Sequence, residues 1–162
     1  MMPTLVSTRR RLMIGAAQAA MTLIVSRPAW AAVLPMMVVT RDPNCGCCGA
    51  WIAHVRAAGF PVEVVEAADL APLKVKLGIP DALSSCHTAE VSGYVVEGHA
   101  PADAIKRLLV ERPEATGLAV PGMPVGSPGM EVPGAPAEVY DVVLFGPVSQ
   151  RVFARYRGSR EA

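Results

Sequence analysis

The sequence has no cluster of lysines and arginines beyond its N-terminal segment, and charged residues make up only 18% of the chain. Residues 1–31 contain four of the 15 basic residues and none of the 14 acidic ones, so the remainder has 11 basic against 14 acidic residues and a net charge of −3. A nucleic-acid-binding protein needs clustered basic side chains to neutralise phosphates. The composition therefore argues against a nucleic-acid partner.

Beyond that segment the chain also has no apolar run that suggests a membrane span, and it shows no internal repeat. Of its 162 residues, 52% are hydrophobic, which is enough to build a buried core. Length and composition together predict one compact domain preceded by an N-terminal extension.

The extension, residues 1–31, has the three parts of an export signal peptide. The arginines Arg9–Arg11 precede an uncharged apolar stretch that is short for a bilayer span, and Ala29-Trp30-Ala31 is a small-x-small cleavage site. The arginines also resemble a twin-arginine signal, although a Sec signal fits as well. A membrane anchor or a buried helix is the alternative. We expect cleavage near Ala31 and a periplasmic domain of residues 32–162 with no membrane span.

The rest of the chain alternates strand and helix patterns. Strands are expected at 36–40, 61–65, 91–97, 139–145 and 152–156, and helices at 49–58, 69–77 and 102–111. The first strand, the first helix and the second strand form a β-α-β unit, which forces the two strands to be parallel. The order resembles an α/β, thioredoxin-like single domain with a mixed β-sheet flanked by helices.

Residues 117–136 have a different composition, because proline and glycine are dense there and Met123 and Met130 are embedded among them. Such a segment cannot form regular structure. Strand patterns follow it, so we expect an ordered loop inside the domain rather than a disordered tail.

Three cysteines, Cys45, Cys47 and Cys48, lie within four positions between the first strand and the first helix. A disulfide between Cys47 and Cys48 would strain the backbone, and one between Cys45 and Cys47 would close a very small ring. Cys45 and Cys48 have the C-x-x-C spacing of thioredoxin-like redox enzymes. A helix N-terminus favours thiolates, and Cu(I) ions bridged by sulfur would neutralise several of them at once. We therefore predict a multinuclear Cu(I) site.

Other metals fit this spacing less well. Structural zinc sites usually contain two separated C-x-x-C pairs around one tetrahedral ion, whereas this chain has one tight triplet and one distant thiol. An iron–sulfur cluster is chemically conceivable but ranks below copper in an oxidising compartment.

The fourth cysteine, Cys86, lies in the polar segment Ser84–Thr88. An inert structural cysteine would have apolar neighbours on both sides. In a thioredoxin-like sheet the loop before the third strand faces the first strand-to-helix turn, so we expect Cys86 to meet the triplet. A buried structural cysteine is the alternative.

The remaining candidate ligands are weaker. His87 is a candidate auxiliary metal ligand, or a residue that orients a ligand, and a solvated histidine is the alternative. Met123 and Met130 have thioethers that suit Cu(I), although methionine more often packs than ligates. For His54 and His99 we expect surface or helix-capping roles.

Four segments of the chain resemble a known family: Cys45–Cys48, Ser85–Thr88, Gly93–His99 and Pro121–Glu131. They look like the CopG-type exported copper-resistance proteins, which were catalogued as a domain of unknown function. The resemblance extends from about Met36 to about Tyr156. It implies a thioredoxin-like fold, a role in copper tolerance and a multinuclear copper–thiolate cluster on Cys45, Cys47, Cys48 and Cys86.

The resemblance leaves the use of the copper open. The leading hypothesis is a non-catalytic Cu(I)-binding protein for sequestration, tolerance or transfer, with copper-efflux or copper-carrier proteins as its periplasmic partners. The alternatives are a thiol-disulfide or copper redox enzyme that uses Cys45 and Cys48, and a disulfide-stapled structural module.

Overall fold

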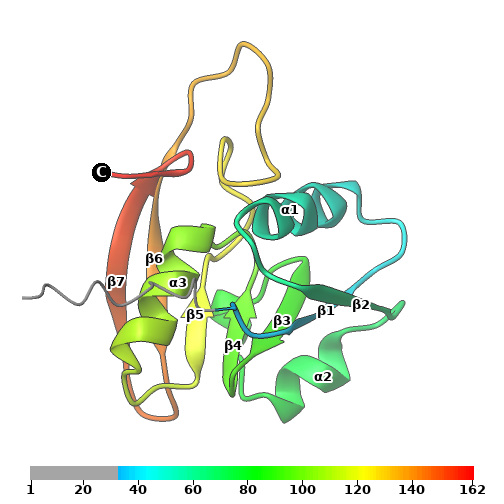
Figure 1. The fold of residues 1–162 in the computed structure, drawn as a ribbon, viewed down its shortest axis with the longest axis vertical. Coiled ribbons are helices and arrows are strands. Elements are labelled where there is room, and N and C mark those ends of the chain that lie inside the picture. The colour runs from blue at the N-terminus through cyan, green and yellow to red at the C-terminus, as the bar shows by residue number, and fades with distance from the viewer. Residues whose placement is uncertain (1–32) are drawn as a thin grey trace, which may run out of the picture. The chain divides into compact units, whose positions relative to one another are not determined.

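The structure is a computed structural model that describes residues 33–162 (Figure 1). The expected signal peptide lies outside the described residues, so the domain boundary near Ala31 stays a prediction. In chain order the elements are β1 (Met37–Arg41), α1 (Gly46–Ala57), β2 (Val62–Glu66), α2 (Ala71–Lys76), the short 3-10 helix η1 (Asp81–Leu83), β3 (His87–Val91), β4 (Tyr94–Glu97), α3 (Ala102–Glu111), β5 (Gly117–Ala119), β6 (Val139–Phe145), β7 (Gln150–Arg157) and β8 (Arg160–Glu161).

The strands form one mixed sheet in the order β2-β1-β3-β4-β5-β6-β7-β8. The pairs β1–β2 and β4–β5 are parallel, and each is connected through a helix, as parallel neighbours require. The other neighbours are antiparallel. The α/β class and the mixed sheet flanked by helices are confirmed, while the thioredoxin-like assignment stays a prediction.

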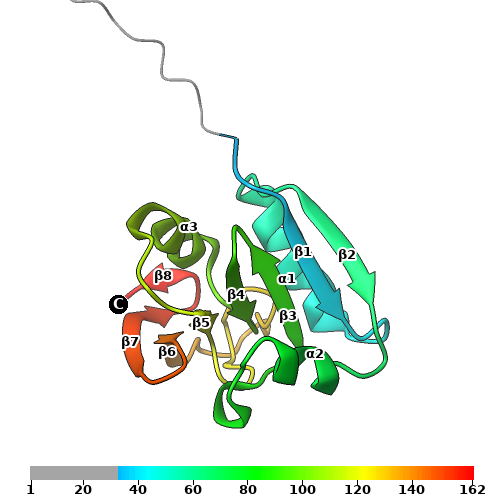
Figure 2. The same ribbon diagram turned by 90° about the horizontal axis from the view of Figure 1, so that it is seen from below.

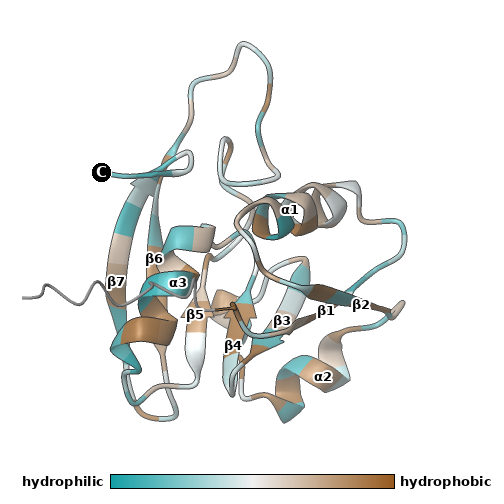
Figure 3. Cartoon of the chain, viewed as in Figure 1, coloured by the Kyte–Doolittle hydropathy of each residue, from teal (hydrophilic) through white to brown (hydrophobic). Residues whose placement is uncertain are grey.

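Each face of the sheet has its own apolar cluster, because successive strand side chains point to opposite faces. The larger cluster contains Val96 and Leu118 and is covered by α1 and α3. The smaller one contains the adjacent residues Val95 and Ala119, together with Ile79 and Leu83 from the segment after α2. Figure 3 shows the apolar residues along these strands, and Figure 2 gives the view from below. The helix α1 that carries the cysteines therefore rests on the larger core.

The structure corrects two expectations about the strands. The single strand expected at 91–97 contains only the last residue of β3, a turn and β4, and β3 begins earlier, at His87. The two strands form a hairpin whose turn residues Ser92 and Gly93 have φ values of 49° and 84°. Two consecutive positive φ values are typical of a tight hairpin turn that matches the strand twist. In the segment 117–136, where no regular structure was expected, the first three residues form β5, held between β4 and β6.

All three expected helices are present, but only one has the predicted bounds. The helix expected at 102–111 is confirmed as α3, whereas α1 begins at Gly46 and not at 49. The helix expected at 69–77 spans Ala71–Lys76, its N-cap residue is Leu70, and the Asp69 carboxylate accepts the Ala71 N–H at 2.9 Å. Within residues 33–162, none of the helices combines the length and the apolar character that a bilayer crossing requires.

Candidate metal centre

Three cysteines are gathered by the first turn of α1. Cys45 is the N-cap residue, and Cys47 and Cys48 lie in the turn that follows it. Asp42 holds the turn that leads into α1, because its carboxylate accepts the Asn44 N–H at 2.7 Å and its carbonyl accepts the Cys45 N–H at 3.1 Å. No acidic residue lies in this turn, so the free N–H groups of the helix end can stabilise negative charge on sulfur.

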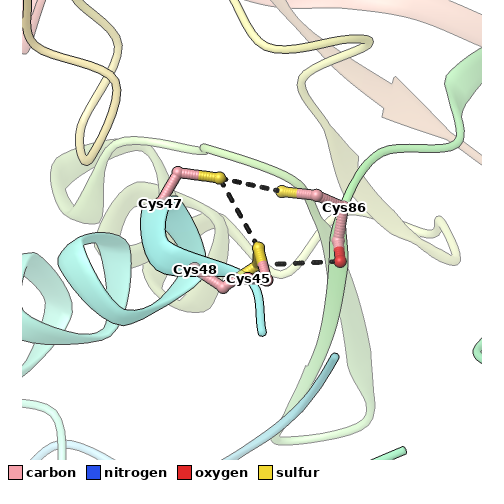
Figure 4. Close-up of side chains that lie close together, drawn as sticks. All are labelled: Cys45, Cys47, Cys48 and Cys86. Atoms are coloured by element: carbon pink, nitrogen blue, oxygen red, sulfur yellow. Dashed lines mark hydrogen bonds between the residues drawn. A yellow bond between two sulfur atoms is a disulfide. The ribbon is translucent and has the colours of Figure 1, made fainter. Parts of the chain in front are cut away.

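Cys86 reaches this turn from the segment before β3, 38 to 41 residues further along the chain (Figure 4). Its Sγ lies 3.9 Å from the Cys47 Sγ, which in turn lies 3.5 Å from the Cys45 Sγ. Cys48 is fully buried, and its Sγ lies 3.7 Å from the Cys86 carbonyl oxygen. All four sulfurs lie within 4.8 Å of one another, as expected of the ligands of a metal cluster.

Cys45 and Cys48 form a disulfide, whereas Cys47 and Cys86 are free thiols (Figure 4). The disulfide joins the two cysteines that have the C-x-x-C spacing in the sequence. In this oxidation state two of the four sulfurs are unavailable as thiolate ligands. The two free thiols, Cys47 on α1 and Cys86 before β3, lie next to each other.

Cys86 also belongs to a second group of ligand atoms, which contains His87 and His99. The Cys86 Sγ lies 3.3 Å from Nδ1 of His87 and 3.1 Å from Nε2 of His99. Nδ1 of His99 lies 2.9 Å from the Pro128 carbonyl, which can only accept, so this nitrogen carries the proton and Nε2 presents its lone pair to the sulfur. Such an arrangement fixes the imidazole for ligation.

Burial controls the charge of these groups. It raises the pKa of the Cys86 thiol to about 12, with the neighbouring Cys47 as the next cause. It lowers the pKa of His87 to about 3, and it also lowers the pKa of His99. Without metal the Cys86 thiol therefore keeps its proton at neutral pH, and both imidazoles are neutral. A cation that binds here would displace the thiol proton.

The prediction for His99 was wrong, because His99 is fully buried beside Cys86 and not at the surface. His99 follows the end of β4 and Gly98, whose φ is 71°, and its ring centroid lies 5.1 Å from that of His87 at the start of β3. His54 does have the expected capping role, since its Nε2 accepts the N–H of Ala102 in the first turn of α3 at 3.1 Å. His87 is also fully buried, with its ring 4.3 Å from that of Trp51, so it is not a solvated loop histidine.

The loop between β5 and β6 covers one side of the cysteines. Gly129 lies so close to α1 that a Cβ atom there would come 2.6 Å from the Trp51 nitrogen and 2.9 Å from the Cys47 carbonyl oxygen. Met123 is 52% exposed, whereas Met130 is half-buried. A role of either thioether as a ligand stays a prediction.

Sequence reasoning missed two charged residues, Lys74 and Glu97, that meet next to Cys86. They form an ion pair in which the Glu97 side chain is completely buried. The signal that could have found Glu97 is a carboxylate at the end of an otherwise apolar strand, Tyr94–Glu97, because a carboxylate is almost never fully buried without a partner.

Comparisons with known proteins show what this chain resembles. Residues 83–130 match the family described as "Protein of unknown function, DUF411". A search of curated proteins finds no match.

Two solved structures share the fold. One, titled "Copper resistance protein copG- Form 1", has 45% sequence identity and a TM-score of 0.72, and the match covers 77% of this chain and 99% of that one. The other, titled "Form 2" of the same protein, has 45% identity and a TM-score of 0.72, with 76% and 98% covered. At this identity over this length, the chain belongs to the CopG-type copper-resistance family.

Proposed function

We propose that this chain is an exported periplasmic protein that binds Cu(I) through a thiolate cluster of Cys45, Cys47, Cys48 and Cys86, for sequestration, tolerance or transfer of copper. The observation that carries the proposal is the approach of Cys86 to the triplet, because it gathers four sulfurs within 4.8 Å of one another. The titles of the related structures, which name a copper-resistance protein, support copper as the metal.

The ligand chemistry favours a soft monovalent ion. Thiolates prefer Cu(I), and sulfurs this close together would repel one another as anions unless several cations bridge them. The half-buried setting of Cys47 and Cys86 limits access by water, and the loop at Gly129 closes one side. We infer a multinuclear cluster, with Met123 or Met130 as an auxiliary soft ligand and His87 beside the sulfurs.

Copper loading requires the Cys45–Cys48 disulfide to be open. A thiol reductant would supply two electrons and two protons, breaking the S–S bond and giving two thiols. Binding of Cu(I) then releases the thiol protons, including that of Cys86.

The test is an anaerobic Cu(I) titration of the reduced protein against a chromophoric competitor, followed by metal analysis. We expect more than one copper ion per chain, and a large loss when any one of the four cysteines is changed to serine. The matched control keeps all four cysteines and carries Met36→Leu, a change at an exposed residue at the start of the domain. This variant should bind copper like the wild type. Zinc in place of copper, or no metal after copper exposure, would contradict the proposal.

Export is tested separately by N-terminal sequencing of protein recovered from the periplasm. We expect the mature chain to begin near residue 32, and an intact N-terminus in the cytoplasm would contradict it.

A second candidate function is a thiol-disulfide or copper redox enzyme that uses Cys45 and Cys48. The disulfide at the N-terminus of α1 supports it, because that is where a thiolate is stabilised as a leaving group. The group of Cys86, His87 and His99 supports a copper redox role, since imidazole nitrogens suit Cu(II) as well as Cu(I). Reductase turnover that is undiminished by Cys86→Ser would favour the thiol-disulfide enzyme over the copper protein.

A further inference from the structure

The side chains of Lys74 and Glu97 bind the residue that precedes Cys86, and Thr88 binds both of these side chains. We call Lys74, Thr88 and Glu97 together the Ser85 clamp. Oε1 of Glu97 accepts the Ser85 N–H at 2.6 Å, and Nζ of Lys74 donates to the Ser85 carbonyl at 3.0 Å. Both peptide polar groups of Ser85 are therefore bound by charged side chains. Hydrogen bonds to charged groups are stronger than neutral ones, so this segment is held tightly.

The clamp is itself fixed by bonds among its members. The Thr88 hydroxyl donates to Oε2 of Glu97 at 2.6 Å and accepts from Nζ of Lys74 at 3.2 Å. Lys74 and Glu97 also form an ion pair. Glu97 and Thr88 are buried in adjacent strands, where they are paired in register, so the carboxylate has a defined position relative to β3.

The side chain of Ser85 is also held in place. Its hydroxyl donates to the Gly122 carbonyl at 2.6 Å, which links the clamp to the start of the loop that covers the cysteines. A Cβ atom on Gly98 would lie 2.6 Å from the Ser85 Oγ, so the end of β4 and Ser85 are packed closely.

The burial of this ion pair is not explained by stability. Moving two charges out of water is costly, and well-packed apolar residues of similar size often give equal or greater stability. The charged pair fixes the orientation of the Ser85 backbone, because it binds both the N–H and the C=O of Ser85 and an apolar pair cannot. We propose that Lys74 and Glu97 are positioning residues that hold the Cys86 thiol against Cys47. As a role in copper binding, this rests on the proposed function.

The position of the thiol can be measured without copper. In the metal-free protein with the Cys45–Cys48 disulfide intact, Cys47 and Cys86 are the two free thiols, and their sulfurs are 3.9 Å apart. Dibromobimane becomes strongly fluorescent when it alkylates two neighbouring thiols. The rate of this bridging therefore reports the approach of Cys86 to Cys47, and Cys86→Ser sets the background.

The decisive variant is the double change Lys74→Met with Glu97→Leu, which removes both charges together and avoids leaving one buried ion unpaired. The Ser85 N–H, the Ser85 C=O and the Thr88 hydroxyl lose these partners, so we expect a moderate fall in melting temperature. We expect the protein to stay folded, while bridging loses most of its rate. We expect its Cu(I) affinity to fall by about 10- to 100-fold, as is typical when a residue that orients a metal ligand is lost. Lys74→Met with Glu97→Gln keeps an acceptor for the Ser85 N–H. It should restore a substantial part of the bridging rate and of the Cu(I) affinity.

Ile105→Val is the control, since Ile105 is fully buried on α3 in the larger core and does not belong to the clamp. It should lower stability without changing the bridging rate. If the Lys74→Met/Glu97→Leu protein is folded and bridges at the wild-type rate, the proposal is wrong. If bridging falls in that variant while even the wild type binds no copper, positioning of Cys86 is supported and the proposed function has failed.

Discussion

The two sides of the cysteine cluster are built in different ways. Cys45, Cys47 and Cys48 are neighbours in sequence and are held by the backbone of one helical turn, with Cys45 and Cys48 in a disulfide. Cys86 is brought there by β3 and by a network of buried polar side chains, among them Glu97 and His99. The first side depends on local geometry, and the second depends on the whole sheet. Substitutions should therefore affect the two sides differently.

The largest effect on stability is expected from breaking the network on the Cys86 side. Glu97→Leu alone leaves the Lys74 ammonium largely buried without its carboxylate. Breaking one partner of a buried ion pair costs about 3–5 kcal/mol of unfolding free energy. Urea denaturation should show this loss, and Asp141→Asn, in the exposed pair with Arg155, should stay near the wild type. Equal effects would show that the network gives no special support.

The next test compares the two sides by removing one thiolate from each. Cys86→Ser and Cys47→Ser should both weaken Cu(I) binding by more than the roughly 10- to 100-fold expected for the loss of a residue outside the ligand set. Cys86→Ser should also change His99, because it replaces the sulfur 3.1 Å from Nε2. The measurements are competitive Cu(I) titration and the NMR shifts of the His99 ring. Unchanged copper affinity in Cys86→Ser would remove Cys86 from the cluster.

A smaller effect is expected where the loop meets the helix. Gly129→Ala would place a methyl group 2.6 Å from the Trp51 nitrogen at a φ of 85°, so the loop must move away from α1. We expect the free energy of unfolding to fall by about 1–3 kcal/mol, and we expect air to oxidise the cluster faster. Gly134→Ala is the matched control, because its φ is 81° but nothing lies within 4 Å of the added carbon. Equal losses in both would mean that backbone strain alone is responsible.

The smallest effect concerns pH. Burial lowers the pKa of His54, despite opposing attraction from Glu131 and Asp103 and with Lys106 acting in the same direction. A lowered pKa in the folded state contributes stability that is present above the unfolded pKa of 6.5 and is lost as the pH falls through the folded pKa. His54→Gln keeps an acceptor for the Ala102 N–H but does not titrate.

The melting temperature of His54→Gln should therefore fall less between pH 7.5 and pH 5 than that of the wild type, with the difference confined to the acid side. Because His87 and His99 also have lowered pKa values, part of the acid sensitivity will remain. The same slope in both proteins would show that His54 does not contribute.

Much of the fold could be read from local patterns. The helix at 102–111 and the strand at 139–145 were predicted with the bounds the structure has, since each has a clear apolar period and clear end signals. The β3–β4 hairpin was missed because both strands are short and because β3, with the sequence HTAEV, begins inside a polar segment that was expected to be a loop. β5 was missed because its three residues, Gly117–Ala119, become a strand only through pairing with β4 and β6.

The sequence by itself determined the crowding of Cys45, Cys47 and Cys48 at the start of a helix, because residues so close in the chain cannot be far apart in space. Only the tertiary structure decided what lies opposite them. The distance from Cys86 to Cys47, the burial of His99 and the pairing of Lys74 with Glu97 depend on strand register and on the turn at Gly98. A local pattern carries no information about such contacts, because they are made by residues that meet only when the sheet is assembled.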